Sequence, residues 1–285
     1  MKWPLRTFFF LIFVSAQAFA QNPSFEPDRL FVKLAPGAKL LDQNLITRSK
    51  RLFGNVLLLR TKNAVQLENA LRKDPGVEWT EKSFFHEASS LPDQTSFNKE
   101  QLAGAKINLG VNDPRTKAQW ALADAKQNGV SYLRAQTLAP SWEARSVIVG
   151  ILDTGVDYNH EDLKDVMWIN PAEIAKNGID DDKNGYVDDV RGIDLIGRDS
   201  DPAAASFHGT HVAGIVGAVA NNGKGIVGVT QHAVILPIRM VPDETNESDR
   251  DVVEAMLYAA KNGAKVLNCS FGKGREGRMV EETIQ

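Results

Sequence analysis

The stretch HGTHVAGIVGA, residues 208–218, constrains the fold more than any other part of this sequence. Gly209, Ala213 and Gly217 recur at four-residue steps, which places them on one face of a helix. Because glycine inside a helix costs about 0.5–1 kcal/mol relative to alanine, we expect this bare face to lie tightly against something flat. His208 falls at the start of the helix. A buried helix with two structural histidines is the simpler alternative.

A second stretch lies upstream. Residues 147–152, VIVGIL, form the short apolar run of a fully buried parallel strand and lead into Asp153. Reactive side chains in open α/β sheets follow the C-terminal ends of strands. A carboxylate there accepts a hydrogen bond from an imidazole and stabilises the imidazolium. We therefore expect Asp153 to pair with His208, although a cap or turn role is the plain alternative for Asp153.

The two motifs together resemble those of the subtilisin-like serine peptidases, the subtilases. The aspartate motif reads ILDTGVD at 151–157, the histidine motif follows in the family's order, and VLNCSFG at 266–272 is similar to the family's cleft-lining strand. The resemblance implies an α/β fold with a doubly wound parallel sheet, with Asp153 as the orienting carboxylate and His208 as the general base. It also implies that extended peptide or protein substrates pair with the last strand edge. The implied wall of the specificity pocket is Ser270, Phe271 and Gly272.

The first 20 residues have the pattern of a secretory signal. Lys2 and Arg6 supply positive charge, residues 8–14 are apolar, and Ala18-Phe-Ala20 is a small-residue cleavage site. The apolar run is too short to cross a bilayer of about 30 Å as a helix, so an uncleaved anchor is the lesser alternative. We expect a secreted, periplasmic or extracellular protein with no membrane association after signal removal. The net charge of −3 gives no electrostatic case for nucleic acid.

Residues 21–88 are expected to form a small α+β domain. Strands are predicted at 29–34, 56–60 and 77–80 and a helix at 64–72. The segments FVKLAPG (31–37) and LRKDPGVEWTE (71–81) resemble the subtilase inhibitor prodomain, which implies a zymogen whose tail, around 81–86, occupies its own cleft. An unrelated ferredoxin-like domain is the alternative. The remaining expected divisions are a processing region or N-terminal extension at 89–140 and the N-terminal part of a subtilisin-like catalytic domain at 141–285.

An acidic segment between the two motifs has the spacing of a calcium loop. Oxygen-bearing side chains alternate around the turn residue Gly185, as a hard cation requires. Arg191 stands where an EF-hand has its bidentate glutamate, so the match is partial, and Asp189 is a candidate substitute. A solvated turn is the alternative to a structural Ca²⁺ site. The predicted ligands are Asp180, Asp182, Asn184, Tyr186 and Asp188.

Two expected features of a subtilase do not occur in these residues. The family's nucleophile lies in a Gly-Thr-Ser-Met/Leu-Ala segment, and its oxyanion asparagine lies in a Gly-Asn stretch; neither occurs here. We therefore expect the sequence to stop inside the catalytic domain and this chain alone to be inactive, with the complete protein a secreted serine endopeptidase. A non-catalytic exported protein that binds peptides or proteases is the alternative. Cys269, the single cysteine, is expected to be a buried inert thiol.

Overall fold

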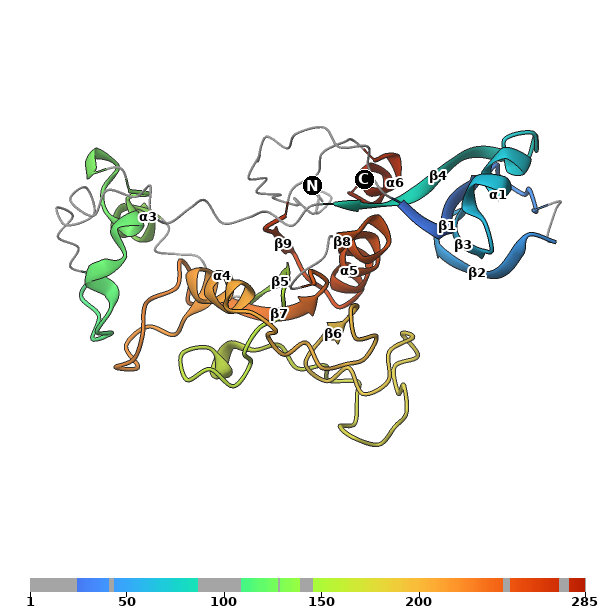
Figure 1. Cartoon of the computed structure of the whole chain (residues 1–285). Coiled ribbons are helices and arrows are strands. Elements are labelled where there is room, and N and C mark those ends of the chain that lie inside the picture. Colours follow the sequence, from blue (N-terminus) through green and yellow to red (C-terminus); the bar gives the residue numbers. More distant parts are fainter. Residues whose placement is uncertain are drawn as a thin grey trace, which may run out of the picture. The chain divides into compact units, whose positions relative to one another are not determined.

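A computed structural model describes most of the chain (Figure 1). Its described residues fall into two compact units. The first lies within 89–243 and 258–270, and the second within 14–88, 244–257 and 271–285. The signal-like segment, residues 1–20, and residues 89–108 of the expected processing region lie outside the described residues. Those described are 25–40, 44–86, 109–127, 129–138, 146–242, 247–271 and 277–284.

The first unit is built on a four-stranded parallel sheet. Its order is β6-β7-β5-β9, and every neighbouring pair is parallel. The apolar run that leads into Asp153 forms the interior strand β5, which pairs on one side with β7 and on the other with β9. The expected parallel α/β sheet is therefore confirmed. The strands are β5 (Val147–Asp153), β6 (Ile193–Asp194), β7 (Ala233–Arg239) and β9 (Val266–Cys269).

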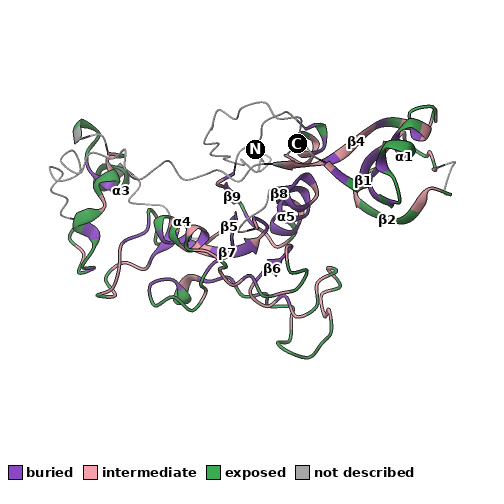
Figure 2. Cartoon of the chain, in the orientation of Figure 1, coloured by how far each residue is buried: buried purple, intermediate pink, exposed green. Residues whose placement is uncertain are grey.

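Helices cover both faces of this sheet. Helix α4 (Phe207–Gly217) packs through Ala213 onto the face that carries Val149 and Ile151. Helix α5 (Asp249–Lys261) places Ala259 on the opposite face, where a side chain at Gly150 would meet it at 3.3 Å. Figure 2 shows β5 and β7 as buried throughout most of their length. Alternate residues of one strand thus contact different helices, as in a doubly wound sheet.

Pro237 lies inside β7, although proline is disfavoured in an interior strand because it cannot donate to a hydrogen-bond ladder. The carbonyl of Pro237 points at Gly192, where an added Cβ would lie only 2.1 Å from it. In a parallel strand the N–H and C=O of one residue point to the same side. The missing N–H therefore faces the β6 side, where pairing is limited to Ile193 and Asp194.

The second unit is an antiparallel sheet in the order β2-β3-β1-β4-β8. The expected strands are present, but β4 continues to His86, and the first strand begins at Phe25. Strand β2 was not expected, because its central residues are polar and exposed and show no apolar alternation. The elements are β1 (Phe25–Leu34), β2 (Ile46–Phe53), β3 (Val56–Thr61), α1 (Ala64–Leu71), β4 (Val77–His86), β8 (Glu247–Ser248) and α6 (Arg278–Ile284).

The two faces of this antiparallel sheet have separate apolar cores. Leu30, Leu59 and Leu67 belong to the core under α1. Phe31 and Trp79 lie on the other face, in a cluster that also holds Val253 of α5 and Met279 of α6. Residues far apart in the sequence therefore form one unit, because the start of α5 and helix α6 supply the apolar surface that this face needs.

Where the structure describes them, the connecting segments of the first unit carry short helices. None of the helices that the structure describes is long and apolar enough to cross a membrane. These short elements are η2 (Thr116–Ala118), η3 (Trp120–Leu122), η4 (Ala125–Gln127), α3 (Tyr132–Leu138) and η5 (Lys164–Val166).

Candidate active site

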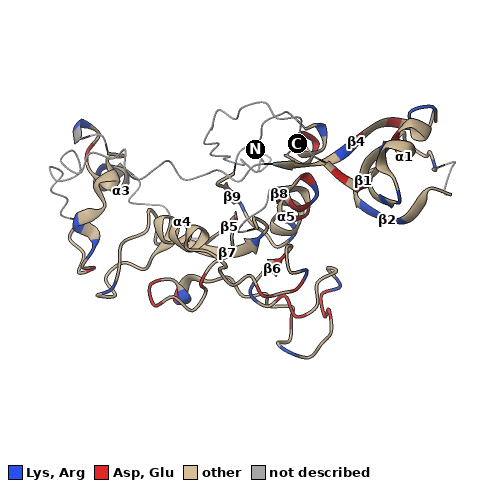
Figure 3. Cartoon of the chain, in the orientation of Figure 1, with Lys and Arg blue, Asp and Glu red and all other residues tan. Residues whose placement is uncertain are grey.

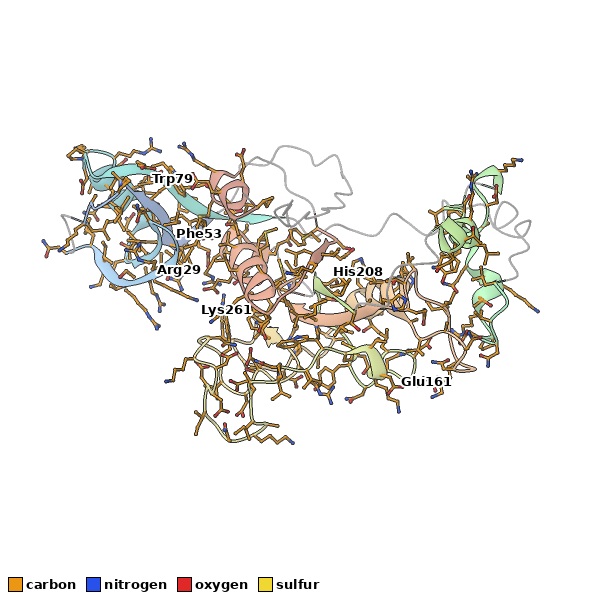
Figure 4. The ribbon with its side chains drawn as sticks, turned by 180° about the vertical axis from the view of Figure 1, so that it is seen from behind. Arg29, Phe53, Trp79, Glu161, His208 and Lys261 are labelled. Atoms are coloured by element: carbon orange, nitrogen blue, oxygen red, sulfur yellow. The ribbon has the colours of Figure 1, made fainter. Side chains whose placement is uncertain are left out.

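The fold brings Asp153 and His208 together across 55 residues of sequence. Asp153 is the last residue of β5 and its side chain is 2% exposed. His208 is the second residue of α4, and its Nδ1 lies 2.7 Å from Oδ1 of Asp153. His208 is labelled in Figure 4 at the start of that helix. This is the arrangement in which a carboxylate fixes one tautomer of an imidazole and leaves Nε2 to act as a base.

Two hydroxyl side chains hold this pair in place. Thr154 donates through its backbone N–H, at 2.7 Å, and its Oγ1, at 3.2 Å, to Oδ1 of Asp153. The same Oγ1 accepts from the hydroxyl of Ser206 at 3.1 Å and from the backbone N–H of Gly209 at 3.2 Å. Ser206 is also the N-cap of α4 and accepts from the N–H of His208. Thr154 therefore ties the carboxylate to the first turn of the histidine helix.

Two glycines allow the close approach that this contact needs. A Cβ at Gly209 would lie 2.1 Å from the carbonyl oxygen of Gly155 and 3.2 Å from Cβ of Asp153. Gly155 itself has φ +91° and lies against the carbonyl of Ala203. At the far end of α4, a Cβ at Gly217 would be 3.1 Å from Ala233. The bare helix face predicted from the sequence is thus the face that meets the aspartate turn and the sheet.

The electrostatics of the pair favour a protonated imidazole more than the helix position alone suggests. The hydrogen bond that the ring donates to Asp153 raises the pKa of His208 above its usual range, while partial burial of the ring acts in the opposite direction. The partial positive charge of the helix N-terminus opposes protonation of the ring. A carboxylate at 2.7 Å outweighs that effect, because it carries a full charge in direct contact.

One atom of the pair has no partner among the described residues. Oδ2 of Asp153 is buried and accepts no hydrogen bond there.

Cys269 ends the neighbouring strand β9 and is buried, and burial together with the charge of Asp153 raises the pKa of its thiol to about 12. A thiol with such a pKa is not a nucleophile at neutral pH. Cys269 therefore packs in the sheet as an inert side chain, as the sequence suggested.

The acidic loop uses four of its expected ligands to hold its own backbone, because Asp182 and Asn184 also accept from the N–H groups of Asn184 and Tyr186. The oxygens of Asp180 accept from the N–H groups of Asn184 and Gly185. Those of Asp188, which has φ +56°, accept from the N–H groups of Asn177 and Gly178. Tyr186 packs its ring edge-on against Tyr258 at 5.2 Å between centroids. Asp180, Tyr186 and Asp188 therefore have structural contacts of their own in this loop, which is rich in acidic residues in Figure 3.

A tighter group forms around Asp182. One carboxylate oxygen each from Glu173, Asp182 and Asp189 lie within 4.8 Å of one another. Asn184 contacts two of them, donating at 2.9 Å to Asp182 and at 2.8 Å to Asp189. Asp189 is fully buried, which raises the pKa of its carboxyl group, and it also accepts from the hydroxyl of Tyr258 at 2.6 Å. The all-oxygen character of this group is what a hard divalent cation prefers.

The expected substrate wall is described only in part. Ser270 follows β9 directly, and its hydroxyl accepts from the side-chain amide of Asn268 at 2.7 Å. Phe271 is buried, and Gly272 lies outside the described residues. The wall formed by these three residues remains a prediction.

Sequence reasoning missed three residues that the geometry brings to these sites. Thr154 and Ser206 lie beside the two catalytic candidates, and a hydroxyl residue two positions before a helical histidine is a recognisable N-cap signal. Glu173 had no such signal, because it stands apart from the spaced acidic run and reaches Asp182 only through the folding of the loop.

Comparison with known proteins agrees with this geometry. Residues 144–285 match the Subtilase family. The chain is 33% identical over 206 residues to Subtilisin-like protease 1 of Plasmodium vivax, covering 70% of this chain and 32% of that protein. It is 30% identical over 170 residues to the Cell wall-associated protease of Bacillus subtilis (strain 168), covering 58% of this chain and 17% of that protein.

A solved structure shares the fold. Fervidolysin from Fervidobacterium pennivorans, described as a keratinolytic enzyme related to subtilisin, aligns with a TM-score of 0.58 and 19% identity over 94% of this chain and 39% of that one. The chain spans about a third of the length of the Plasmodium vivax relative. The matched region contains β5, α4 and β9, and so includes both catalytic candidates. The chain therefore belongs, through residues 144–285, to the subtilase family of serine peptidases.

Proposed function

We propose that this chain supplies the aspartate and histidine of a secreted serine endopeptidase. The observation that carries the proposal is the 2.7 Å contact between Nδ1 of His208 and the buried carboxylate of Asp153. In such a triad the imidazole takes the proton of a serine hydroxyl and later gives it to the leaving amine. Asp153 stabilises the imidazolium formed in between. The family match supports the reaction class.

The nucleophile must come from outside the printed residues under this proposal. None of them has the family's Gly-Thr-Ser-Met/Leu-Ala pattern. Ser270 lies directly after a strand and its hydroxyl is hydrogen-bonded to Asn268, so it is not poised against His208. The oxyanion asparagine is assigned in the same way to polypeptide beyond these residues. Substrate, on this proposal, is an extended peptide or protein segment that pairs with the edge of β9.

Residues 21–88, of which the structure describes 25–40 and 44–86, are proposed to be an inhibitory prodomain. Contacts of its last strand support this. Phe85 and His86 of β4 pair antiparallel with β8, and the N–H of Phe84 donates to Asp249 at 3.1 Å. Glu81 accepts from the first N–H groups of α6, at 3.2 and 2.6 Å. The domain thus binds elements that follow the histidine motif in the chain, as an intramolecular partner would.

Export is proposed from the pattern of the first 20 residues. The name of the Bacillus subtilis relative, a cell wall-associated protease, supports a location outside the cytoplasm. The given residues contain a single cysteine, so no disulfide forms among them after export. Packing and bound ions would have to serve that purpose.

A structural Ca²⁺ is proposed at Glu173, Asp182 and Asp189. The residues fit a cation because Oε2 of Glu173 is buried and without a hydrogen-bond partner among the described residues. Three carboxylates this close repel one another, and the donors on Asp182 and Asp189 leave Oε2 of Glu173 for a cation to neutralise. The ion would hold the loop after η5 in place and stabilise the folded chain, and it would take no part in the reaction.

Adding Ca²⁺ is expected to raise the melting temperature of the chain, by an amount equivalent to about 2.7 kcal/mol at a hundredfold excess over the Kd. Asp182→Asn should abolish this gain. Glu173→Gln removes a member of the Glu173, Asp182 and Asp189 group and should also lose the gain. Asp180→Asn removes a ligand predicted only from the sequence spacing and should keep it. Differential scanning calorimetry with EGTA checks this. An unchanged melting temperature with EGTA would rule the ion out. If, of this pair, only Asp180→Asn lost the gain, the ligands predicted from the sequence spacing would hold the ion instead.

The proposed reaction is tested on the product of the complete reading frame. A fluorophosphonate probe is expected to label one serine of that product, and His208→Ala is expected to abolish labelling because the serine loses its base. Asp157→Asn, in an exposed position of the same motif, is the matched control and should label normally. A complete product that folds but takes up no label would instead support a non-catalytic peptide- or protease-binding protein.

A further inference from the structure

The antiparallel sheet of the second unit carries a row of three arginines. Arg29 of β1 is the register partner of Arg60 of β3, and Arg60 is in turn the partner of Arg48 of β2. Directly opposite residues of neighbouring strands point to the same face of a sheet. These residues, here called the arginine row, therefore lie on one face across three adjacent strands. Arg29 is labelled in Figure 4, and Figure 3 shows the positive charge along β2.

Such a row destabilises a sheet unless something neutralises it. Like charges directly opposite each other on paired strands are unfavourable. Among the described residues, Asp28 contacts Nε of Arg60 at 3.2 Å and also pairs with Arg29, and the carboxylate of Glu26 interacts electrostatically with Arg29. Arg48 has no ion-pair or hydrogen-bond partner in the described part of the chain. Its neighbour on the same face, Lys50, has one in Glu254 at 2.9 Å.

Protection of a sheet edge does not explain the row. Edge strands often carry lysine or arginine to block pairing with other chains, and β2 is the edge strand here. Arg60 and Arg29 lie on the second and third strands, where no edge needs protection. Edge protection therefore does not account for the charge on these interior strands.

A pocket lies where the row meets the strand ends. Its volume is about 440 Å³. Such a volume falls within the range of about 300–1,000 Å³ common for small-molecule sites. Three cationic side chains and one carboxylate give the lining a net formal charge of +2. The hydroxyl of Thr47 donates to the carbonyl of Arg60 and is therefore not free to bind a ligand. The lining residues are Asp28, Thr47, Arg48, Arg60, Thr61 and Lys62.

We propose that this pocket binds the phosphate group of a small phosphate monoester. A dianion matches the net charge of the lining, and guanidinium groups bind phosphate oxygens through paired N–H donors. Arg48 and the terminal nitrogens of Arg60 supply those donors, and Lys62 adds a point charge. The pocket is larger than a bare phosphate group needs, which leaves room for an organic part. The bound anion would neutralise Arg48 and Arg60, the two members of the arginine row that line the pocket.

The test titrates the full chain with glycerol phosphate and follows binding by calorimetry. We expect saturable binding with a Kd below about 1 mM. Arg48→Gln and Arg60→Gln should each weaken it about tenfold or more, whereas Lys73→Gln, which removes an exposed charge elsewhere in the same unit, should leave it unchanged. Succinate, a dicarboxylate of equal charge, should bind at least about tenfold more weakly.

The melting temperature gives a second readout that a purely structural arginine would not produce. Without phosphate, Arg48→Gln should melt at the same or a higher temperature than the wild type, because repulsion in the row falls. With glycerol phosphate, the wild type should gain and the variant should not. The proposal is overturned by absence of saturable binding, by an equal loss in Lys73→Gln, by equal binding of succinate, or by a variant that melts lower in phosphate-free buffer.

Discussion

Replacing Asp153 with asparagine is expected to lower the kcat/KM of the complete protein about 10⁴-fold, while the fold is retained. An amide in that position keeps the size of the side chain but turns the imidazole of His208 to the wrong tautomer, because the amide can donate where the carboxylate only accepts. Hydrolysis of a peptide substrate by the variant measures the loss, and far-ultraviolet circular dichroism checks the fold.

The same motif offers the control for this exchange. Asp157 is exposed, and its carboxylate accepts from the N–H of Asn159 in a local turn. Asp157→Asn should therefore keep activity close to that of the wild type. Comparable losses in the two variants would mean that the motif acts through its backbone turn, and the assigned role of Asp153 would be withdrawn.

Replacing Gly209 with alanine is expected to cost about 1–3 kcal/mol of unfolding free energy or more. The added methyl group would lie 2.1 Å from the carbonyl oxygen of Gly155, so α4 must move away from the aspartate turn. His208 moves with it, because it is the preceding residue of the same helix. Urea unfolding measures the cost, and peptide hydrolysis by the complete protein should fall in the same variant.

Gly214 is the matched control within the same helix. A Cβ there would meet Ile226 at 3.6 Å, an ordinary contact. Because alanine is the better helix former by about 0.5–1 kcal/mol, Gly214→Ala should be neutral or stabilising. If Gly209→Ala were as stable as Gly214→Ala, the close approach of α4 to the aspartate turn would not exist in solution.

The sequence predicted the parts of the fold where hydrophobic pattern and turn chemistry agree. The run before Asp153 became β5, and the glycine-punctuated stretch became α4. Ser248 and Asp251 cap α5 in the S/T-x-x-acid pattern that a sequence shows, with the N–H of Asp251 donating to the serine hydroxyl at 3.2 Å, and Gly263 follows the helix with φ +83°. Local signals were sufficient there because the same residues serve both local structure and packing.

The parts that could not be predicted depend on contacts between distant segments. Strand β2 has no apolar alternation, because it lies at the edge of its sheet and its central residues face solvent. In the acidic loop, the spacing of the predicted ligands does not reveal that backbone N–H groups also need these oxygens as hydrogen-bond acceptors. Asp180 and Asp188 accept from such amides, and Glu173, which spacing did not single out, lies beside Asp182 instead.

The hydrogen bond between Asp153 and His208 is tested most directly by NMR titration of the His208 ring in this chain, which needs no nucleophile. The pKa of His208 is expected above its ordinary value of 6.5 and is expected to fall in Asp153→Asn, because the hydrogen bond to the carboxylate is the main cause of the shift. Since the folded pKa is raised, the pair's contribution to stability is complete below the unfolded pKa and is lost as pH rises through the folded one. A pKa at or below 6.5 that does not change in Asp153→Asn would contradict the pairing.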